Sequence, residues 1–156
     1  MGWWSLTGAN DKAIVVLMIP AFDKRGNLPQ GIYTATLKEV ERKFAYTVHR
    51  RYLFGGLKRL LENLKAARCT TFYLDGSFIT KKEKPSDYDC TWDPTGVTDL
   101  LDKDLLKSLE VRKDKYLGDI FVYMPEHGGF PYLEYFQRDK DDNPKGIIKI
   151  DLGKPL

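Results

Sequence analysis

The stretch Tyr73-Leu-Asp-Gly-Ser-Phe-Ile-Thr-Lys-Lys-Glu-Lys-Pro-Ser-Asp-Tyr-Asp89 carries the most informative pattern in the chain. It starts inside a β-branched and aromatic segment, Thr70–Asp75, which predicts a strand ending in a Gly-Ser pair. A charged loop follows, and the alternation over Ser86–Trp92 predicts the next strand. Because residues two apart on a strand point to the same face, we expect Asp87 and Asp89 to project side by side.

The residue types in this stretch predict a site for phosphate and metal. Two adjacent carboxylates repel each other, so at least one of Asp87 and Asp89 should have a raised pKa when no cation is bound. Hard oxygen ligands of this kind suit Mg²⁺ or Mn²⁺ shared with substrate phosphates. Gly76 allows the backbone to approach a phosphate closely, and Ser77 adds a hydroxyl donor. Aspartate is also a common turn former, so a purely structural role stays open.

Gly-Ser, a short loop and then Asp-x-Asp resembles the signature of the polymerase-β-type nucleotidyltransferase superfamily, including its minimal bacterial members. The wider pattern resembles a family of small bacterial proteins placed in that superfamily, over roughly residues 18–152. The segments that carry this likeness are Leu28–Gly31, Tyr73–Phe78, Pro85–Asp89, Trp92–Pro94, Gly118–Phe121, Phe136-Gln137 and Lys145–Ile147.

The resemblance implies a metal-dependent transfer of a nucleoside monophosphate from an NTP to a hydroxyl of a protein, RNA or small molecule. It implies a third carboxylate on a later strand, which would bind metal and act as general base, and Asp119 matches best. Glu134 and Asp139 are rivals for that role, and Gly118 directly before Asp119 departs from some members of the superfamily. Lys81, Lys82 and Lys84 could contact the triphosphate or form a solvated loop.

A non-catalytic reading of the same resemblance stays open. Some members of the superfamily are thought to lack activity, and minimal members work in toxin–antitoxin or defence gene pairs. The chain would then be a regulatory module whose partner is a toxin, an antitoxin or a helix-turn-helix protein. A chain of 156 residues leaves little room for a separate substrate-binding domain, so a partner could also supply that surface.

The remaining patterns predict an α/β (α+β) domain with a mixed sheet flanked by helices. Thr36–Glu39 is a capping box that starts a short helix, and a second helix is expected over 48–68, with Gly55-Gly56 marking a bend or a close packing contact. The other expected elements are a leucine-rich helix capped by Thr98 or Asp99, a strand over Asp119–Tyr123, a short helix over Tyr132–Arg138, a turn over Asp141–Gly146 and a strand over Ile147–Leu152.

Composition restricts the class of protein. Hydrophobic residues make up 42% and charged residues 30%, which is a globular balance, and the longest apolar run, Ala13–Ile19, is far shorter than the roughly 20 residues that span a bilayer. The net charge of +3 is too small to indicate nucleic-acid binding by itself. Eight basic residues and one acid lie between Arg42 and Arg68, and we interpret them chiefly as a solvated helix face, with nucleic-acid binding the weaker alternative.

The domain limits and the compartment are also expectations. Residues 18–156 are interpreted as one domain, and residues 1–17 as an extension, either a native arm that can be disordered or a misassigned start before Met18. The start lacks the features of a signal peptide, and Cys69 and Cys90 show no disulfide spacing, so we expect a cytoplasmic protein with free thiols. His49 and His127 lack metal-binding spacing and are expected to be non-catalytic.

Overall fold

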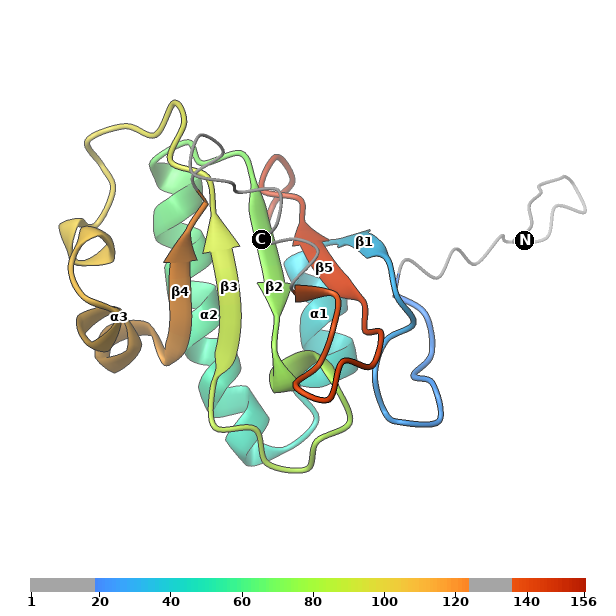
Figure 1. The fold of residues 1–156 in the computed structure, drawn as a ribbon. Helices are drawn as coiled ribbons and strands as arrows, with labels where there is room; N and C mark the ends of the chain where they lie inside the picture. Colours follow the sequence, from blue (N-terminus) through green and yellow to red (C-terminus); the bar gives the residue numbers. More distant parts are fainter. Residues whose placement is uncertain (1–18, 124–135) are drawn as a thin grey trace, which may run out of the picture.

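The computed structural model describes residues 19–123 and 136–156, and these residues form an α+β fold around a mixed sheet. Five strands pair in the order β1-β5-β2-β3-β4 (Figure 1). The pairs β1–β5 and β3–β4 are parallel, whereas β2 runs antiparallel to both β5 and β3. The bounds are β1 Ile32–Ala35, α1 Leu37–Phe44, α2 Val48–Ala66, β2 Phe72–Asp75, the 3₁₀ helix η1 Ser77–Ile79, β3 Tyr88–Trp92, the 3₁₀ helix η2 Lys103–Leu106, α3 Leu109–Tyr116, β4 Gly118–Val122 and β5 Ile147–Ile150.

Helices α1 and α2 cover one face of the sheet and form the core with it (Figure 1). Alternation along the strands sends one set of apolar side chains toward the helices and leaves the aspartates on the opposite face, beside a smaller apolar cluster around Phe136 and Ile147. The buried strand residues on the helix side include Ala35, Phe72, Leu74, Tyr88, Cys90, Trp92, Ile120, Ile148 and Ile150. The opposite face carries aspartates, and the candidate site lies there.

Helix termini follow the local sequence closely. The Thr36 hydroxyl accepts a hydrogen bond from the Glu39 amide, and the Glu39 carboxylate accepts one from the Thr36 amide, so the predicted capping box is confirmed. Inside α2, a Cβ on Gly56 would lie 2.2 Å from the carbonyl oxygen of Tyr116. The predicted close packing contact is therefore confirmed, and its partner is the end of α3.

The predicted helix over the leucine-rich segment is wrong. Asp102 caps the short helix η2 and Ser108 caps a separate helix, α3. The segment is attached to α2 by Asn63, whose amide group donates to the Leu100 carbonyl and accepts from the Asp102 amide. These tertiary hydrogen bonds replace the continuous helix that the leucine spacing suggested.

The strand β1 was not among the predicted elements, because Ile32–Ala35 is short and follows a turn-rich loop. It forms by pairing with β5, which is more than 110 residues away in the sequence. The predicted turn near Asp141 is confirmed, closed by a bridge between Arg138 and Pro144. The expected extension 1–17 and most of the expected helix over 132–138 lie outside the described residues.

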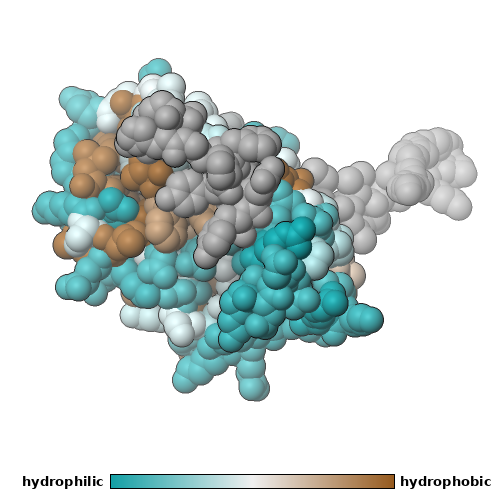
Figure 2. Space-filling model, viewed as in Figure 1, coloured by the Kyte–Doolittle hydropathy of each residue, from teal (hydrophilic) through white to brown (hydrophobic). Residues whose placement is uncertain are grey.

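The surface differs between the two sides of the face seen in Figure 2. Apolar side chains gather over the side of β4 and α3, where Leu100, Leu106 and Leu109 are exposed. The segment from Arg138 to Lys145 forms a hydrophilic surface near the middle of the view. Cys69 and Cys90 are buried free thiols, and no helix in the described part of the chain is long and apolar enough to cross a membrane.

Candidate functional site

A row of aspartates crosses three neighbouring strands on the face opposite the helices. Asp89 in β3 is the register partner of Asp119 in β4 and of Asp75 at the end of β2. Register partners on adjacent strands point to the same face of a sheet, so the three side chains project together. The parallel pairing of β3 with β4 places the later strand beside the Asp-x-Asp strand.

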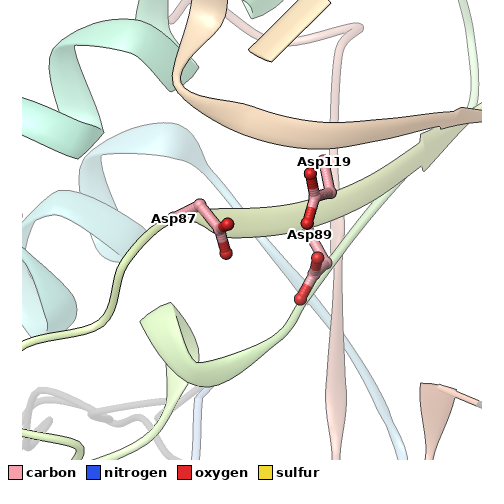
Figure 3. A group of neighbouring side chains, drawn as sticks. All are labelled: Asp87, Asp89 and Asp119. Atoms are coloured by element: carbon pink, nitrogen blue, oxygen red, sulfur yellow. The ribbon is translucent and has the colours of Figure 1, made fainter. Parts of the chain in front are cut away.

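Asp87, directly before β3, joins this row and completes a compact cluster. One carboxylate oxygen from each of Asp87, Asp89 and Asp119 lies within 4.8 Å of those of the other two (Figure 3). The predicted convergence of these side chains is confirmed. Gly118 departs from the pattern of some superfamily members, and the structure gives a local reason for the glycine. A Cβ at this position would lie 2.3 Å from the Tyr88 ring.

The electrostatics of the cluster are uneven. Burial raises the pKa of Asp89 to about 7, and the negative charges of Asp87, Asp75 and Asp119 add to the effect. This confirms the expectation that one carboxylate of the Asp-x-Asp pair has a raised pKa. The ammonium of Lys113 lies 2.6 Å from Asp87 Oδ2 and 3.2 Å from Asp119 Oδ1. The single ammonium of Lys113 is therefore shared by the two outer carboxylates, and Asp89 has no direct ion pair among the described residues.

A buried ion pair lies beside the cluster. Lys145 Nζ is 3.0 Å from Asp75 Oδ1, and the two side chains are only 12% and 5% exposed. Burial raises the pKa of Asp75, and the charge and hydrogen bond of Lys145 oppose that shift. Lys145 lies in the turn before β5, so the ion pair connects the end of β2 with this turn.

The Gly-Ser pair lies directly against Asp89. Gly76 has φ +87°, and a Cβ there would lie 2.2 Å from Asp89 Oδ2, so only glycine fits this position without displacement. Ser77 begins η1, the short turn that directly follows β2 and Gly76. The Gly-Ser turn therefore lies next to the carboxylate cluster, with Asp89 at the point of contact.

A cavity of about 950 Å³ opens at this point. Asp75, Gly76, Ser77 and Asp89 form one wall, and the rest of the lining is a mixture of acidic and polar residues (Asn27, Thr80, Asp139, Asp141 and Asp142) with basic and aromatic ones. Those basic and aromatic residues are Lys82, Phe121, Phe136, Arg138, Lys140 and Lys145.

The other candidate residues differ in how they relate to the cavity. Lys81 is exposed and does not line the cavity. Its backbone amide donates to the Gly26 carbonyl, whereas Lys82 lines the cavity. Asp139 lines the cavity but accepts hydrogen bonds from Asn27 and Asn143, which holds its own turn together. Glu134 and His127 lie outside the described residues.

Arg50 is the largest departure from the expected solvated basic face. It is fully buried, and its guanidinium donates to four backbone carbonyls, those of Phe44, Phe78, Thr80 and Lys82. Its neighbour His49 contacts the Pro85 carbonyl through Nε2. Both residues hold the loop between the Gly-Ser turn and the Asp-x-Asp strand.

Sequence reasoning missed Arg50, Lys145 and the role of Lys113. The signal for Arg50 was its position: three residues before Leu53, seven before Leu57 and eleven before Leu61, it falls on the buried stripe of α2. For Lys145 the sequence offered its place in the Lys145–Ile147 segment that carries the resemblance, but no sign of its ion pair with Asp75. The link between Lys113 and the cluster depends on how α3 packs against β4.

Comparison with curated proteins found no match, and neither did comparison with solved structures. A family model, described as a family of unknown function (DUF6932), matches residues 20–151. That range includes Asp87, Asp89 and Asp119 as well as the Gly-Ser turn. Because the match covers most of the 156 residues, this chain belongs to the DUF6932 family.

Proposed function

We propose that the protein is a metal-dependent nucleotidyltransferase that moves a nucleoside monophosphate from an NTP to the hydroxyl of a protein, an RNA or a small molecule. The observation that carries this proposal is the convergence of Asp87, Asp89 and Asp119 beside the Gly76-Ser77 turn. Neither half of the arrangement is specific alone. Together they supply the two things that phosphoryl chemistry needs, a cation site and a phosphate cradle.

The donor set fits a hard divalent cation. Three carboxylate oxygens within 4.8 Å of one another are suitable ligands for Mg²⁺ or Mn²⁺. Burial, with a smaller effect of the neighbouring carboxylates, raises the pKa of Asp89, and a bound cation would favour its charged form. Asp87, Asp89 and Asp119 would hold the ion. When bound, it would offset the charge that develops on the phosphate oxygens.

The cavity supplies groups for the rest of the nucleotide. The glycine backbone at Gly76 and the Ser77 hydroxyl would contact phosphate oxygens. Lys82, Arg138 and Lys145 line the same cavity and would bind the negatively charged triphosphate. A volume of about 950 Å³ is within the range of ligand-binding clefts.

The transfer reaction needs a base for the attacking hydroxyl. The acceptor oxygen would form a bond to the α-phosphorus of the NTP while the bond from that phosphorus to the pyrophosphate oxygen breaks. The hydroxyl proton would pass to the carboxylate of Asp119, and pyrophosphate would leave. Asp119 suits this role because its side chain is one-third exposed and can reach an incoming acceptor.

The test uses the purified protein with labelled NTPs, Mn²⁺ and a lysate or RNA pool as acceptor. Asp119→Asn is expected to abolish label transfer and to retain nucleotide binding, because a base contributes mainly in the transition state. Asp114→Asn, an exposed carboxylate on α3, is the control and should transfer label like the wild type. Equal transfer by Asp119→Asn and wild type would assign the base elsewhere, and no transfer by the wild type with any NTP would contradict the enzyme.

A second candidate is a nucleotide-binding module that does not catalyse transfer. The ion pairs of Lys113 favour it, because an ammonium already pairs with two of the three carboxylates. Such a module would bind NTP with the same affinity whether or not Mn²⁺ is present. Nucleotide binding that depends on Mn²⁺ would favour the enzyme instead.

A further inference from the structure

Lys113 extends from α3 into the carboxylate cluster. Its ammonium is within hydrogen-bond distance of both Asp87 Oδ2 and Asp119 Oδ1, at 2.6 and 3.2 Å. These carboxylates are two of the three that would hold the metal ion. Among the described residues, no other ion pair or hydrogen bond holds either of them.

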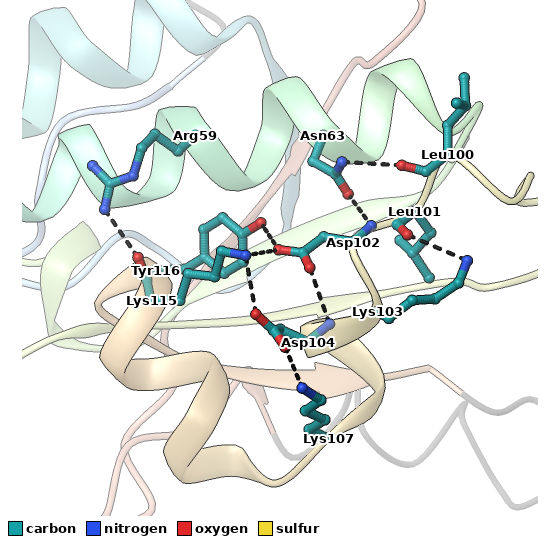
Figure 4. Close-up of polar contacts among 10 residues, drawn as sticks. All are labelled: Arg59, Asn63, Leu100, Leu101, Asp102, Lys103, Asp104, Lys107, Lys115 and Tyr116. Carbon is teal, nitrogen blue, oxygen red and sulfur yellow. Dashed lines mark hydrogen bonds and ion pairs between the residues drawn. The ribbon is translucent and has the colours of Figure 1, made fainter.

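Lys115, two residues further along the same helix, offers a close comparison. Its ammonium lies 2.6 Å from Asp102 Oδ2 and 3.0 Å from Asp104 Oδ2 (Figure 4). Its side chain is as exposed as that of Lys113. Asp102 and Asp104 are embedded in a structural network, in which Asp102 also accepts from the Tyr116 hydroxyl and the Asp104 amide. The two lysines thus have matching ion pairs, but only Lys113 is paired with the cluster.

The ammonium of Lys113 and a divalent cation would compete for the negative charge of the same two carboxylates. The side chain of Lys113 is 46% exposed and comes from a surface helix, so it can rotate into solvent without disturbing the core. Its ion pairs are partly screened by water, which makes this displacement inexpensive. While it is in place, however, its positive charge opposes the arrival of a second cation.

We propose that Lys113 is the resident counter-ion of the cluster, that a divalent cation binds by displacing it, and that it thereby lowers the affinity of the site for free metal. This inference rests on the proposed metal site. When no metal is bound, Lys113 is the charge partner of Asp87 and Asp119. Displacement makes the lysine available to a phosphate once the metal has entered.

The experiment measures Mn²⁺ binding without nucleotide, at fixed pH and ionic strength, by electron paramagnetic resonance of free Mn²⁺. Lys113→Met should bind Mn²⁺ about tenfold more tightly than the wild type, because a competing charge has been removed. Lys115→Met, the matched control, should bind Mn²⁺ like the wild type. Lys113→Arg keeps the positive charge and should not show the gain. Thermal melting before and after Mn²⁺ addition checks that each variant is folded.

Each outcome decides a different claim. Equal or weaker Mn²⁺ binding by Lys113→Met, in a wild type that does bind Mn²⁺, would overturn the role of Lys113 and leave the metal site standing. Tight binding that disappears in Lys113→Met/Asp89→Asn would support the role and place the ion at the cluster. An absence of binding by both the wild type and Lys113→Met at millimolar Mn²⁺ would overturn the metal site and this inference together. Tighter Mn²⁺ binding by Lys113→Met, together with a wild type that transfers no nucleotide, would support the inference and contradict the enzyme.

Discussion

At the residue scale, Asp89 should make the stability of the metal-free protein depend on pH. Its pKa in the folded protein is about 7, against a usual value of 3.8, so between these values the folded state holds a proton that the unfolded state has lost. The contribution of Asp89 to the free energy of unfolding is therefore fully present below pH 3.8 and is lost as pH rises through about 7. In Asp89→Asn, urea denaturation between about pH 4.5 and pH 7.5 should show a flatter decline. Asp114→Asn should keep the wild-type slope, and an unchanged slope in Asp89→Asn would contradict the raised pKa.

Alanine substitutions at Gly76 and Gly96 distinguish the cost of a steric contact from the cost of backbone strain. Both have positive φ, +87° and +76°, but a Cβ at Gly76 meets the Asp89 carboxylate whereas one at Gly96 meets nothing within 4 Å. Gly96→Ala should cost only the left-handed conformation, about 1 kcal/mol. Gly76→Ala should cost more and should also weaken Mn²⁺ binding, because Asp89 must move. Chemical denaturation and Mn²⁺ titration test both variants, and equal costs would show that the contact with Asp89 is unimportant.

At the element scale, the adjacent glycines of α2 test how closely that helix packs against α3. Gly56→Ala should destabilise the protein by about 2 kcal/mol or more, because its methyl group would overlap the Tyr116 carbonyl. Gly55→Ala faces only the end of the Arg59 side chain, 3.8 Å away, and should stabilise the helix by up to about 1 kcal/mol. The measurement is the free energy of unfolding in urea. The same sign of change for both variants would contradict the packing described.

Arg50 connects α2 to the loop that joins the two halves of the site. Arg50→Met would leave the Phe78, Thr80 and Lys82 carbonyls without their donor, which should cost about 3 kcal/mol. Hydrogen exchange should quicken in this loop before the rest of the fold. Arg51→Met is the control, because Arg51 is exposed on the same turn of helix and should change stability by less than about 0.5 kcal/mol. A loop that stays protected in Arg50→Met would show that the arginine does not hold it.

At the scale of the whole molecule, ligand binding should appear as a gain in thermal stability. Mn²⁺ with an NTP at about 100 times the dissociation constant would add about 2.7 kcal/mol to the free energy of unfolding. For a protein of this size that corresponds to several degrees in Tm. The double variant Asp87→Asn/Asp89→Asn should lose the shift. If it responds to Mn²⁺ and NTP like the wild type, the ion binds outside the cluster.

Much of the local structure could be predicted from short-range patterns. The Thr36–Glu39 capping box, the long amphipathic helix and the Asp-x-Asp strand depend on neighbours a few residues apart, so the sequence displays them directly. The strand β1 and the segment around Asp102 could not be predicted in this way. The first depends on pairing with β5, and the second on hydrogen bonds to Asn63 in α2.

The sequence by itself determined which carboxylates share a strand face, because alternation along a strand is a local property. It also predicted that Gly76 lets the backbone approach a phosphate closely, whereas the contact with Asp89 that excludes a side chain there comes from the tertiary structure. Only the tertiary structure decided that β4 pairs with β3 in the register that brings Asp119 to Asp89, and that α3 places Lys113 between Asp87 and Asp119. It likewise decided that Arg50 is buried and Lys145 is paired. The physical reason is that a charged side chain has no preferred partner until packing fixes which opposite charges and carbonyls lie within about 3 Å of it.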